Sequence, residues 1–233
     1  QWVGKRTRRP DGVDKVTGRA RYGDDMSMPG MLHCKVLRSP HAHARIISID
    51  TNKAAALKGV KGVLTSAEIP DHPLSKPPYA PIINDMHDIS RNVMARDKVF
   101  YDGHAVAAVA ATSERIAKAA LKLIDVKYEI LPHVLDPIEA VHPDAPILHE
   151  DQFTYLGGKT SEKPSNLFRS SVGERGDLEK GFSEADIIVE RDFSSAPVHQ
   201  GYIEPLACVA TTSEDGCVEL WTTTQGHFVI RAL

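Results

Sequence analysis

The segment from Val99 to Leu131 constrains the fold more than any other part of the chain. It contains a seven-residue apolar run, residues 105–111, which is too short for a stable helix and indicates a strand covered on both faces. Thr112 and Ser113 then offer N-cap hydroxyls to a helix with an apolar stripe. From Val126 onward, apolar and polar residues alternate as in a half-exposed strand. This order of strand, helix and strand predicts a packed α/β nucleus.

The flanking segments add further strands and short helices to this nucleus. Alternating apolar residues indicate the strands, and capping side chains ahead of apolar periodicity indicate the helix starts. The predicted strands are residues 32–37, 45–50, 60–64, 186–193, 202–211 and 217–223, and the predicted helical segments are residues 51–57, 65–68, 177–185 and 227–233. Residues 69–96 hold five prolines and predict a long loop, and residues 132–164 predict a linker.

Charge and apolar patterning exclude several classes of function. The net charge of −3 argues against a nucleic-acid binder, because phosphate recognition needs a basic surface. The basic cluster at residues 5–9 is typical of a solvated tail, with a nucleic-acid or partner contact as the alternative. No apolar run is long enough to cross a membrane and no secretory segment is found, so we expect no membrane span and a cytoplasmic location.

Neither the cysteines nor the paired histidines predict a metal site. Cys34, Cys208 and Cys217 lack Cys-x-x-Cys spacing, which indicates a reducing compartment and buried thiols. His41 and His43 stand two residues apart, so on a strand they point to opposite faces, and no carboxylate or thiol lies at ligand spacing beside them. We expect a turn whose imidazoles bond to the backbone, with a metal pair as the alternative.

Four sequence words, in order, carry a family resemblance. They are Asp11–Gly18, Leu37–Ile46, Val99–Ala111 and Val126–Glu129. Together they resemble the N-terminal part of the molybdenum-binding subunit of the xanthine dehydrogenase and aldehyde oxidase family. The general likeness is to the bacterial branch that includes 4-hydroxybenzoyl-CoA reductase. The resemblance implies an α+β fold, in which an α/β hammerhead domain is followed by the beginning of a mixed α/β molybdopterin-binding domain.

The resemblance also implies how the chain is divided. We expect an N-terminal extension at residues 1–12, the hammerhead domain at 13–131, a linker at 132–165 and an incomplete molybdopterin-binding domain at 166–233. The chain begins without Met and stops inside a predicted helical turn, so we expect a piece of a longer polypeptide.

One residue takes a cofactor-binding role from the resemblance. Gln225, in Thr-Thr-Thr-Gln-Gly, is similar to a family glutamine at a strand end whose neutral amide donates to an oxygen ligand of molybdenum. Without the resemblance, the same residue reads as the cap of the helix that follows. Glu204 matches a recurrent family glutamate with a structural role near the site, and no function is assigned to His104. No catalytic residue and no direct metal ligand are implied in this chain, and the base glutamate is expected beyond residue 233.

The resemblance implies part of a molybdopterin-dependent oxidoreductase that is catalytically incomplete by itself. The whole enzyme is expected to hydroxylate an aldehyde or an aromatic or heterocyclic carbon, with water as the oxygen source. The molybdenum–molybdopterin cofactor is expected mainly on the missing C-terminal part, with iron–sulfur clusters and FAD on partner subunits of a hetero-oligomer. The alternative is a non-catalytic hammerhead module that docks other subunits.

Overall fold

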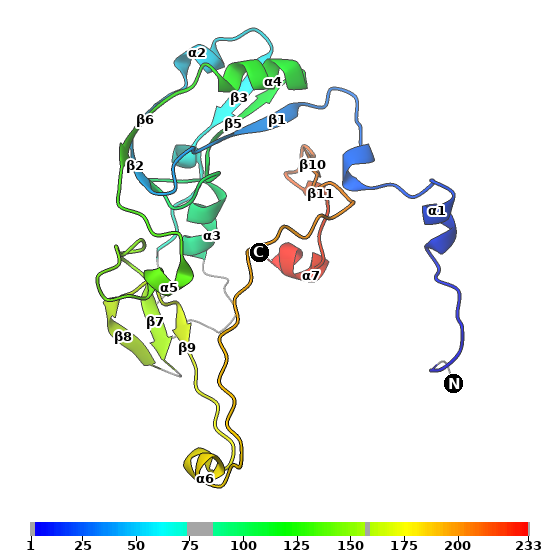
Figure 1. Ribbon diagram of the computed structural model, residues 1–233. Helices are drawn as coiled ribbons and strands as arrows, with labels where there is room; N and C mark the ends of the chain where they lie inside the picture. The colour runs from blue at the N-terminus through cyan, green and yellow to red at the C-terminus, as the bar shows by residue number, and fades with distance from the viewer. Residues whose placement is uncertain (1–2, 74–85, 157–158, 233) are drawn as a thin grey trace. The chain divides into compact units, whose positions relative to one another are not determined.

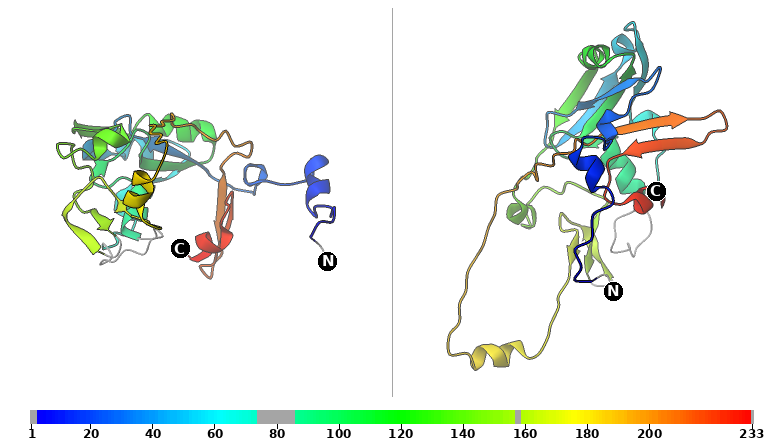
Figure 2. Two further views of the ribbon diagram at one scale, coloured as in Figure 1. Left: turned by 60° about the horizontal axis from the view of Figure 1, so that its bottom comes forward. Right: turned by 90° about the vertical axis from the view of Figure 1, so that its right-hand side faces the viewer.

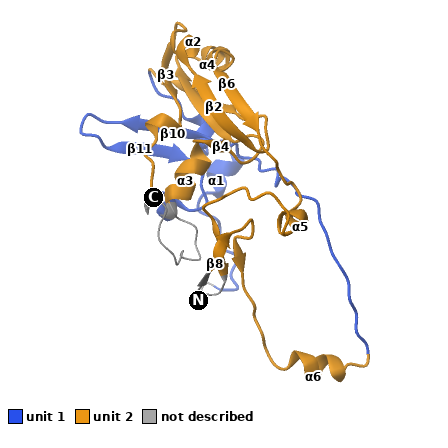
Figure 3. Ribbon diagram, turned by 90° about the vertical axis from the view of Figure 1, so that its left-hand side faces the viewer, with its two compact units in different colours: residues 1–29, 187–233 blue, residues 30–186 orange. Residues whose placement is uncertain are grey.

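The computed structural model describes residues 3–73, 86–156 and 159–232. The chain divides into two compact units (Figure 3). The larger consists of residues 30–186, and the smaller consists of residues 1–29 together with residues 187–233. None of the described helices is long and apolar enough to cross a membrane.

The first sheet of the larger unit confirms the predicted nucleus. Strand β5 (Ala105–Ala111) lies between β1 (His33–Arg38) and β3 (Val60–Leu64), and both neighbours are antiparallel to it. Helix α4 (Glu114–Leu121) packs against all three strands, and the short helix α2 (Asn52–Ala55) lies against β3 and α4 (Figure 1 and Figure 2).

Strand β5 is covered on both faces, as its apolar run predicts. Ala107 and Val109 on one face join the buried cluster that includes Ala120 and Ile124 of the helical region. On the other face, Val106 packs in a second cluster with Ala44, Ala95 and Val99. The small side chains let helix and strand backbones approach closely, so the core of this unit is built largely from alanine and valine.

The larger unit contains a second three-stranded sheet. Its order is β4 (Lys98–Val99), β2 (Ala44–Asp50) and β6 (Asp125–Ile130), with antiparallel pairing throughout. In β6, half-buried Val126 and Tyr128 alternate with exposed Lys127 and Glu129. The predicted half-exposed strand is therefore confirmed.

Side-chain hydrogen bonds to backbone amides mark where helices α4 and α2 begin. Ser113 Oγ accepts a hydrogen bond from the Ile116 amide at 3.3 Å, as expected for the N-cap of α4. Thr51 precedes α2 but its side chain makes no cap bond. Asp50 takes that role instead, because its Oδ1 lies 3.0 Å from the Asn52 amide nitrogen and a carboxylate accepts more strongly than a hydroxyl.

Helix α3 (Met86–Val93) lies within the stretch predicted as a loop, so that prediction is wrong for these residues. Its buried face consists of His87 and Ser90 rather than apolar side chains. Apolar periodicity therefore gives no signal there, and the prolines that precede the helix favour a loop. Residues 74–85 of the predicted loop lie outside the described residues.

The stretch predicted as a linker contains regular structure. It holds helix α5 (Pro137–Ala140), which Asp136 caps, and strands β7 (Phe153–Leu156) and β8 (Lys159–Pro164). Strand β9 (Arg169–Ser170) completes a three-stranded sheet of order β8-β7-β9, in which β7 and β9 run parallel. Farther on, Asp177 caps helix α6 (Leu178–Ser183), which confirms the helix predicted there.

The smaller unit contains a hairpin of β10 (Cys208–Thr212) and β11 (Val218–Thr222) with a turn at Gly216, whose φ is +83°. Helix α7 (His227–Ala232) follows, and helix α1 (Gly12–Val16) and the 3₁₀ turn η1 (Gly23–Asp25) come from the N-terminal segment. The strand predicted at residues 186–193 is not formed. Its apolar residues include Ile187 and Phe193, exposed by 82% and 92%, and none of the described strands lies beside them to complete a ladder.

The three cysteine side chains are exposed, so the prediction of buried thiols is wrong. Cys34 lies on the outward face of edge strand β1, Cys208 opens β10, and Cys217 follows the hairpin turn. Cysteine is usually buried, but the alternation of strand side chains exposes Cys34, and the position beside the hairpin turn exposes Cys217.

Candidate functional site

The strand end that leads to Gln225 is tied to the segment before β10. The Thr223 amide donates to the Ala207 carbonyl at 3.2 Å, which extends the hairpin ladder by one rung. Thr223 Oγ1 also lies 3.3 Å from Glu204 Oε1 and 3.3 Å from the Pro205 carbonyl oxygen. Glu204 therefore lies beside the strand end, in agreement with the structural role implied for it.

The Gln225 amide is exposed and makes no hydrogen bond with the residues that the structure describes. The helix that follows is capped by its neighbours instead. The Gly226 amide donates to Thr224 Oγ1 at 3.0 Å, and the Gly226 carbonyl accepts from the Ile230 amide at 3.0 Å. Gln225 thus does not act as the helix cap, and its amide can donate to a bound group.

The donor chemistry at this strand end fits the cofactor that the resemblance implies. A molybdenum–molybdopterin group presents oxygen ligands on its metal, and when bound it supplies two-electron redox chemistry. A neutral amide can donate to such an oxygen without changing the charge of the centre. Gln225 is the residue of the described chain that would hold the group in this way.

The two paired histidines have different neighbours. His43 is buried, and its Nδ1 lies 2.6 Å from the Pro132 carbonyl oxygen. The His41 ring meets the Tyr128 ring edge-on, with centroids 4.9 Å apart. No group of three or more potential metal ligands occurs among the described residues. The expectation of an imidazole bonded to the backbone is confirmed for His43.

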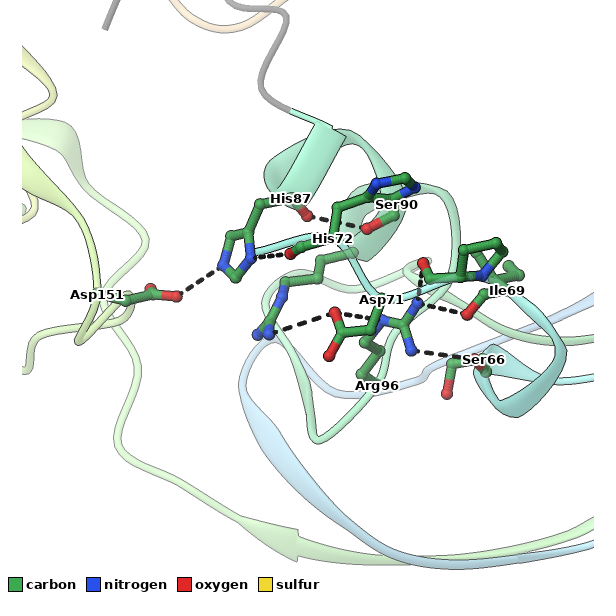
Figure 4. A network of polar contacts seen from close by, with 10 residues as sticks. Ser66, Ile69, Asp71, His72, His87, Ser90, Arg96 and Asp151 are labelled. Atoms are coloured by element: carbon green, nitrogen blue, oxygen red, sulfur yellow. Dashed lines mark hydrogen bonds and ion pairs between the residues drawn. The ribbon is translucent and has the colours of Figure 1, made fainter. Parts of the chain in front are cut away.

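Sequence reasoning missed a polar network that joins helix α3 to two loops (Figure 4). Arg96 donates to the backbone carbonyls of Ser66, Ile69 and Pro70 at 3.2, 2.7 and 2.6 Å. Its guanidinium also lies 3.5 Å from an oxygen of Asp71. These are mostly backbone acceptors, which sequence pattern does not identify, and they fix the loop before α3 rather than offer a reactive group.

His87 links the same helix to Asp151 (Figure 4). Its Nδ1 lies 2.8 Å from the His72 carbonyl oxygen and its Nε2 lies 3.0 Å from Asp151 Oδ2, so both ring nitrogens face acceptors. Burial lowers the pKa of His87, but these two hydrogen bonds outweigh burial, and the pKa is raised. Burial likewise raises the pKa of Asp151, and the bond from His87 reverses the direction, so that pKa is lowered. Both shifts favour a protonated His87 beside an ionised Asp151.

A cavity of about 370 Å³ lies beside this network. Helix α3, residues 100–104 and residues 149–152 line it, and the rings of Phe100 and His149 stack there at 4.1 Å. Burial lowers the pKa of both His104 and His149, so both imidazoles are neutral. His104 Nδ1 accepts from the Phe100 amide and its Nε2 lies 2.9 Å from the Arg91 carbonyl oxygen, which gives it a structural role.

Two family models match the chain. The model described as "Aldehyde oxidase and xanthine dehydrogenase, a/b hammerhead domain" matches residues 17–132. The model described as "Molybdopterin cofactor-binding domain" matches residues 160–233, which include Gln225.

Similar curated proteins are larger than this chain. The carbon monoxide dehydrogenase large chain of Afipia carboxidovorans is 36% identical over the whole chain, and a probable xanthine dehydrogenase component of Bacillus subtilis is 37% identical over 93% of it. The chain spans 28% and 26% of the lengths of those two proteins.

Solved structures agree with the sequence matches. CO dehydrogenase from Oligotropha carboxidovorans superposes with a TM-score of 0.77 and 31% identity, over 98% of this chain and 28% of its own. Quinoline 2-oxidoreductase from Pseudomonas putida 86 gives a TM-score of 0.77 and 29% identity, over 97% and 27%. The chain therefore belongs to the aldehyde oxidase and xanthine dehydrogenase family, and it comprises the hammerhead domain and the beginning of the molybdopterin-binding domain of the molybdenum-binding subunit.

Proposed function

We propose that this chain contributes Gln225 to the molybdenum centre of a molybdenum hydroxylase. The observation that carries the proposal is the exposed Gln225 amide in the turn that follows β11, which bonds to none of the described residues and lies inside the segment that matches the cofactor-binding model. In this role Gln225 orients an oxygen ligand of the metal by donating a hydrogen bond. The chain by itself is not a complete enzyme, and it binds no stoichiometric molybdenum alone.

The whole protein is proposed to hydroxylate an aldehyde or an aromatic or heterocyclic carbon, with oxygen from water. Its partners are the remainder of the molybdenum-binding subunit, an iron–sulfur subunit and an FAD subunit, in a hetero-oligomer in the cytoplasm. The support is the kind of relative that the chain resembles, which includes xanthine dehydrogenase, aldehyde oxidoreductase and quinoline oxidoreductase.

The domain boundaries also enter as a proposal. The hammerhead domain ends near residue 131, residues 132–165 form a linker, and the cofactor-binding domain begins near residue 166. The hammerhead domain begins near residue 13, close to the start of the matching hammerhead model at residue 17, although residues 13–29 cluster with residues 187–233.

Substitution Gln225→Ala in the assembled complete enzyme tests the proposal. Loss of a hydrogen bond that orients a metal ligand costs about ten- to a hundredfold in turnover or metal affinity, or about 1.4 to 2.8 kcal/mol. Glu219→Ala, an exposed change on the same hairpin, is the control and should leave turnover unchanged. If Gln225→Ala keeps full turnover and full molybdenum, Gln225 has no role at the cofactor, and the chain is better described as a hammerhead docking module.

A further inference from the structure

The N-terminal 3₁₀ turn η1 packs against the hairpin that leads to Gln225, although the two are far apart in the sequence. We propose that Gly23 and Glu204 are positioning residues that hold Thr223, and through Thr223 set the direction of the Gln225 amide. The proposal rests on the proposed role of Gln225. It gives the N-terminal segment a part in the molybdenum site, which neither its composition nor its position in the sequence indicates.

Gly23 lies where a side chain would crowd its neighbours. A Cβ atom built on it would be 3.1 Å from the Ala207 carbonyl oxygen and 3.3 Å from Thr223 Oγ1, both closer than ordinary van der Waals contact. Ala207 precedes β10 and Thr223 follows β11, so the Gly23 backbone lies at the open end of the hairpin. The same two residues are joined by the bond from the Thr223 amide to the Ala207 carbonyl, at 3.2 Å.

The turn that carries Gly23 is itself held in place. The Tyr22 amide donates to Asp25 Oδ2 at 3.0 Å, and the Asp25 amide donates to the Tyr22 carbonyl at 3.1 Å. These reciprocal bonds close the turn around Gly23. The glycine is thus presented to the hairpin by a closed turn, not by a loose tail.

Glu204 restrains Thr223 from the segment that leads into β10. The 3.3 Å contact between Thr223 Oγ1 and Glu204 Oε1 lets the hydroxyl donate to a half-buried carboxylate. The threonine therefore meets three chain segments at once: residues 22–25, residues 204–207 and its own strand. Gln225 stands only two residues farther along, and the Thr224 hydroxyl holds the turn between them. A displacement of Thr223 is therefore passed to the Gln225 amide.

The experiment compares Gly23→Ala with Gly12→Ala in the assembled holoenzyme. A Cβ on Gly12 meets only Arg9 Cβ at 3.6 Å, an ordinary contact, so this variant controls for a glycine change in the same segment. We expect Gly23→Ala to lower kcat about tenfold with little change in KM, and to alter the Mo(V) electron paramagnetic resonance spectrum at unchanged molybdenum content. Amide exchange at Thr223 should also accelerate, and it is measured without turnover.

A second pair of variants keeps the test decisive if Gly23→Ala fails to assemble. Glu204→Ala removes the side-chain acceptor for Thr223 Oγ1 and leaves only the Pro205 carbonyl oxygen, whereas Glu204→Gln retains an oxygen at that position. Glu204→Ala should reproduce the kinetic and spectral change, and Glu204→Gln should restore most of the wild-type behaviour. A merely structural glutamate would give the same result for both variants.

The outcomes separate this inference from the proposed function. If Gly23→Ala and Glu204→Ala match wild type in kcat, spectrum and Thr223 exchange while Gln225→Ala is impaired, the positioning role is overturned and the role of Gln225 stands. If Gln225→Ala itself is silent, the proposed function fails and the positioning role fails with it.

Discussion

Substitution Val109→Ala should destabilise the larger unit strongly. Val109 has no exposed surface and packs with Ala107, Ala120 and Ile124. Removing two buried methyl groups costs about 1.6 kcal/mol in transfer free energy, and the cavity adds about 1 kcal/mol at roughly 24 cal/mol per Å³. The alanine neighbours are too short to fill the space, so little of this cost is recovered. The expected loss is about 2.5 kcal/mol, which is roughly 70-fold in an equilibrium constant.

Hydrogen exchange of the β5 amides measures this loss. In the limit where exchange reports opening free energy, amides at residues 106–109 should exchange about 70-fold faster in the variant. Val93→Ala, at an α3 side chain that is 57% exposed, is the matched control and should change stability by less than about 0.5 kcal/mol. Amides at residues 218–222, on the exposed hairpin of the other unit, should exchange fast in every variant. An acceleration below about fivefold in β5 would refute the argument that this core is rigid and closely packed.

Three further changes test smaller features. Ser113→Ala should cost about 1 kcal/mol in a urea titration because it removes the cap of α4, whereas Thr51→Ala, at a side chain without a cap bond, should cost little. The pKa of His87 is raised, so its pairing with Asp151 stabilises the fold fully below the ordinary histidine pKa of about 6.5. This stabilisation is lost as the pH rises through the raised pKa. Wild type should therefore lose more stability than Asp151→Asn between about pH 6 and pH 8. Because Asp151 is about half exposed, the difference should stay below about 1 kcal/mol, and equal losses would show that the pair contributes nothing. A thiol reagent should label all three cysteines in the folded chain, with Cys34 slowest because burial raises its pKa; protection of all three would contradict their exposure.

The nucleus was predictable because local signals agree there. An apolar run, a serine cap and a change of period all indicate the same elements, and the structure confirms them. Helix α3 was not predictable, since its buried face is made of His87 and Ser90, which owe their burial to the fold and not to hydrophobicity. The strand expected at residues 186–193 is the opposite case, an element that was predicted but is not formed. Its residues have high strand propensity, but a strand also needs a partner, and sequence pattern does not provide one.

The residues around the candidate site also divide into those that the sequence could suggest and those that it could not. Gln225 could be proposed because a short sequence word resembles a family motif. Gly23 and Arg96 could not, because Gly23 packs close to a distant backbone carbonyl and Arg96 donates to distant ones, and every residue type carries a backbone carbonyl. A lone glycine in a polar segment gives no signal that separates close packing from flexibility. Such residues are found only when the segments that meet are known.

The alanine-rich contact between α4 and β5 also sets a rule for how the sequence can change over evolutionary time. Ala107 and Ala120 are fully buried and face the same cluster as Val109 and Ile124. A close-packed interior does not accept added volume at one position unless a neighbour gives it up. Relatives that carry a larger residue at position 107 or 120 should therefore carry a smaller one at position 109 or 124, so that these four positions covary as pairs while their summed side-chain volume stays nearly constant.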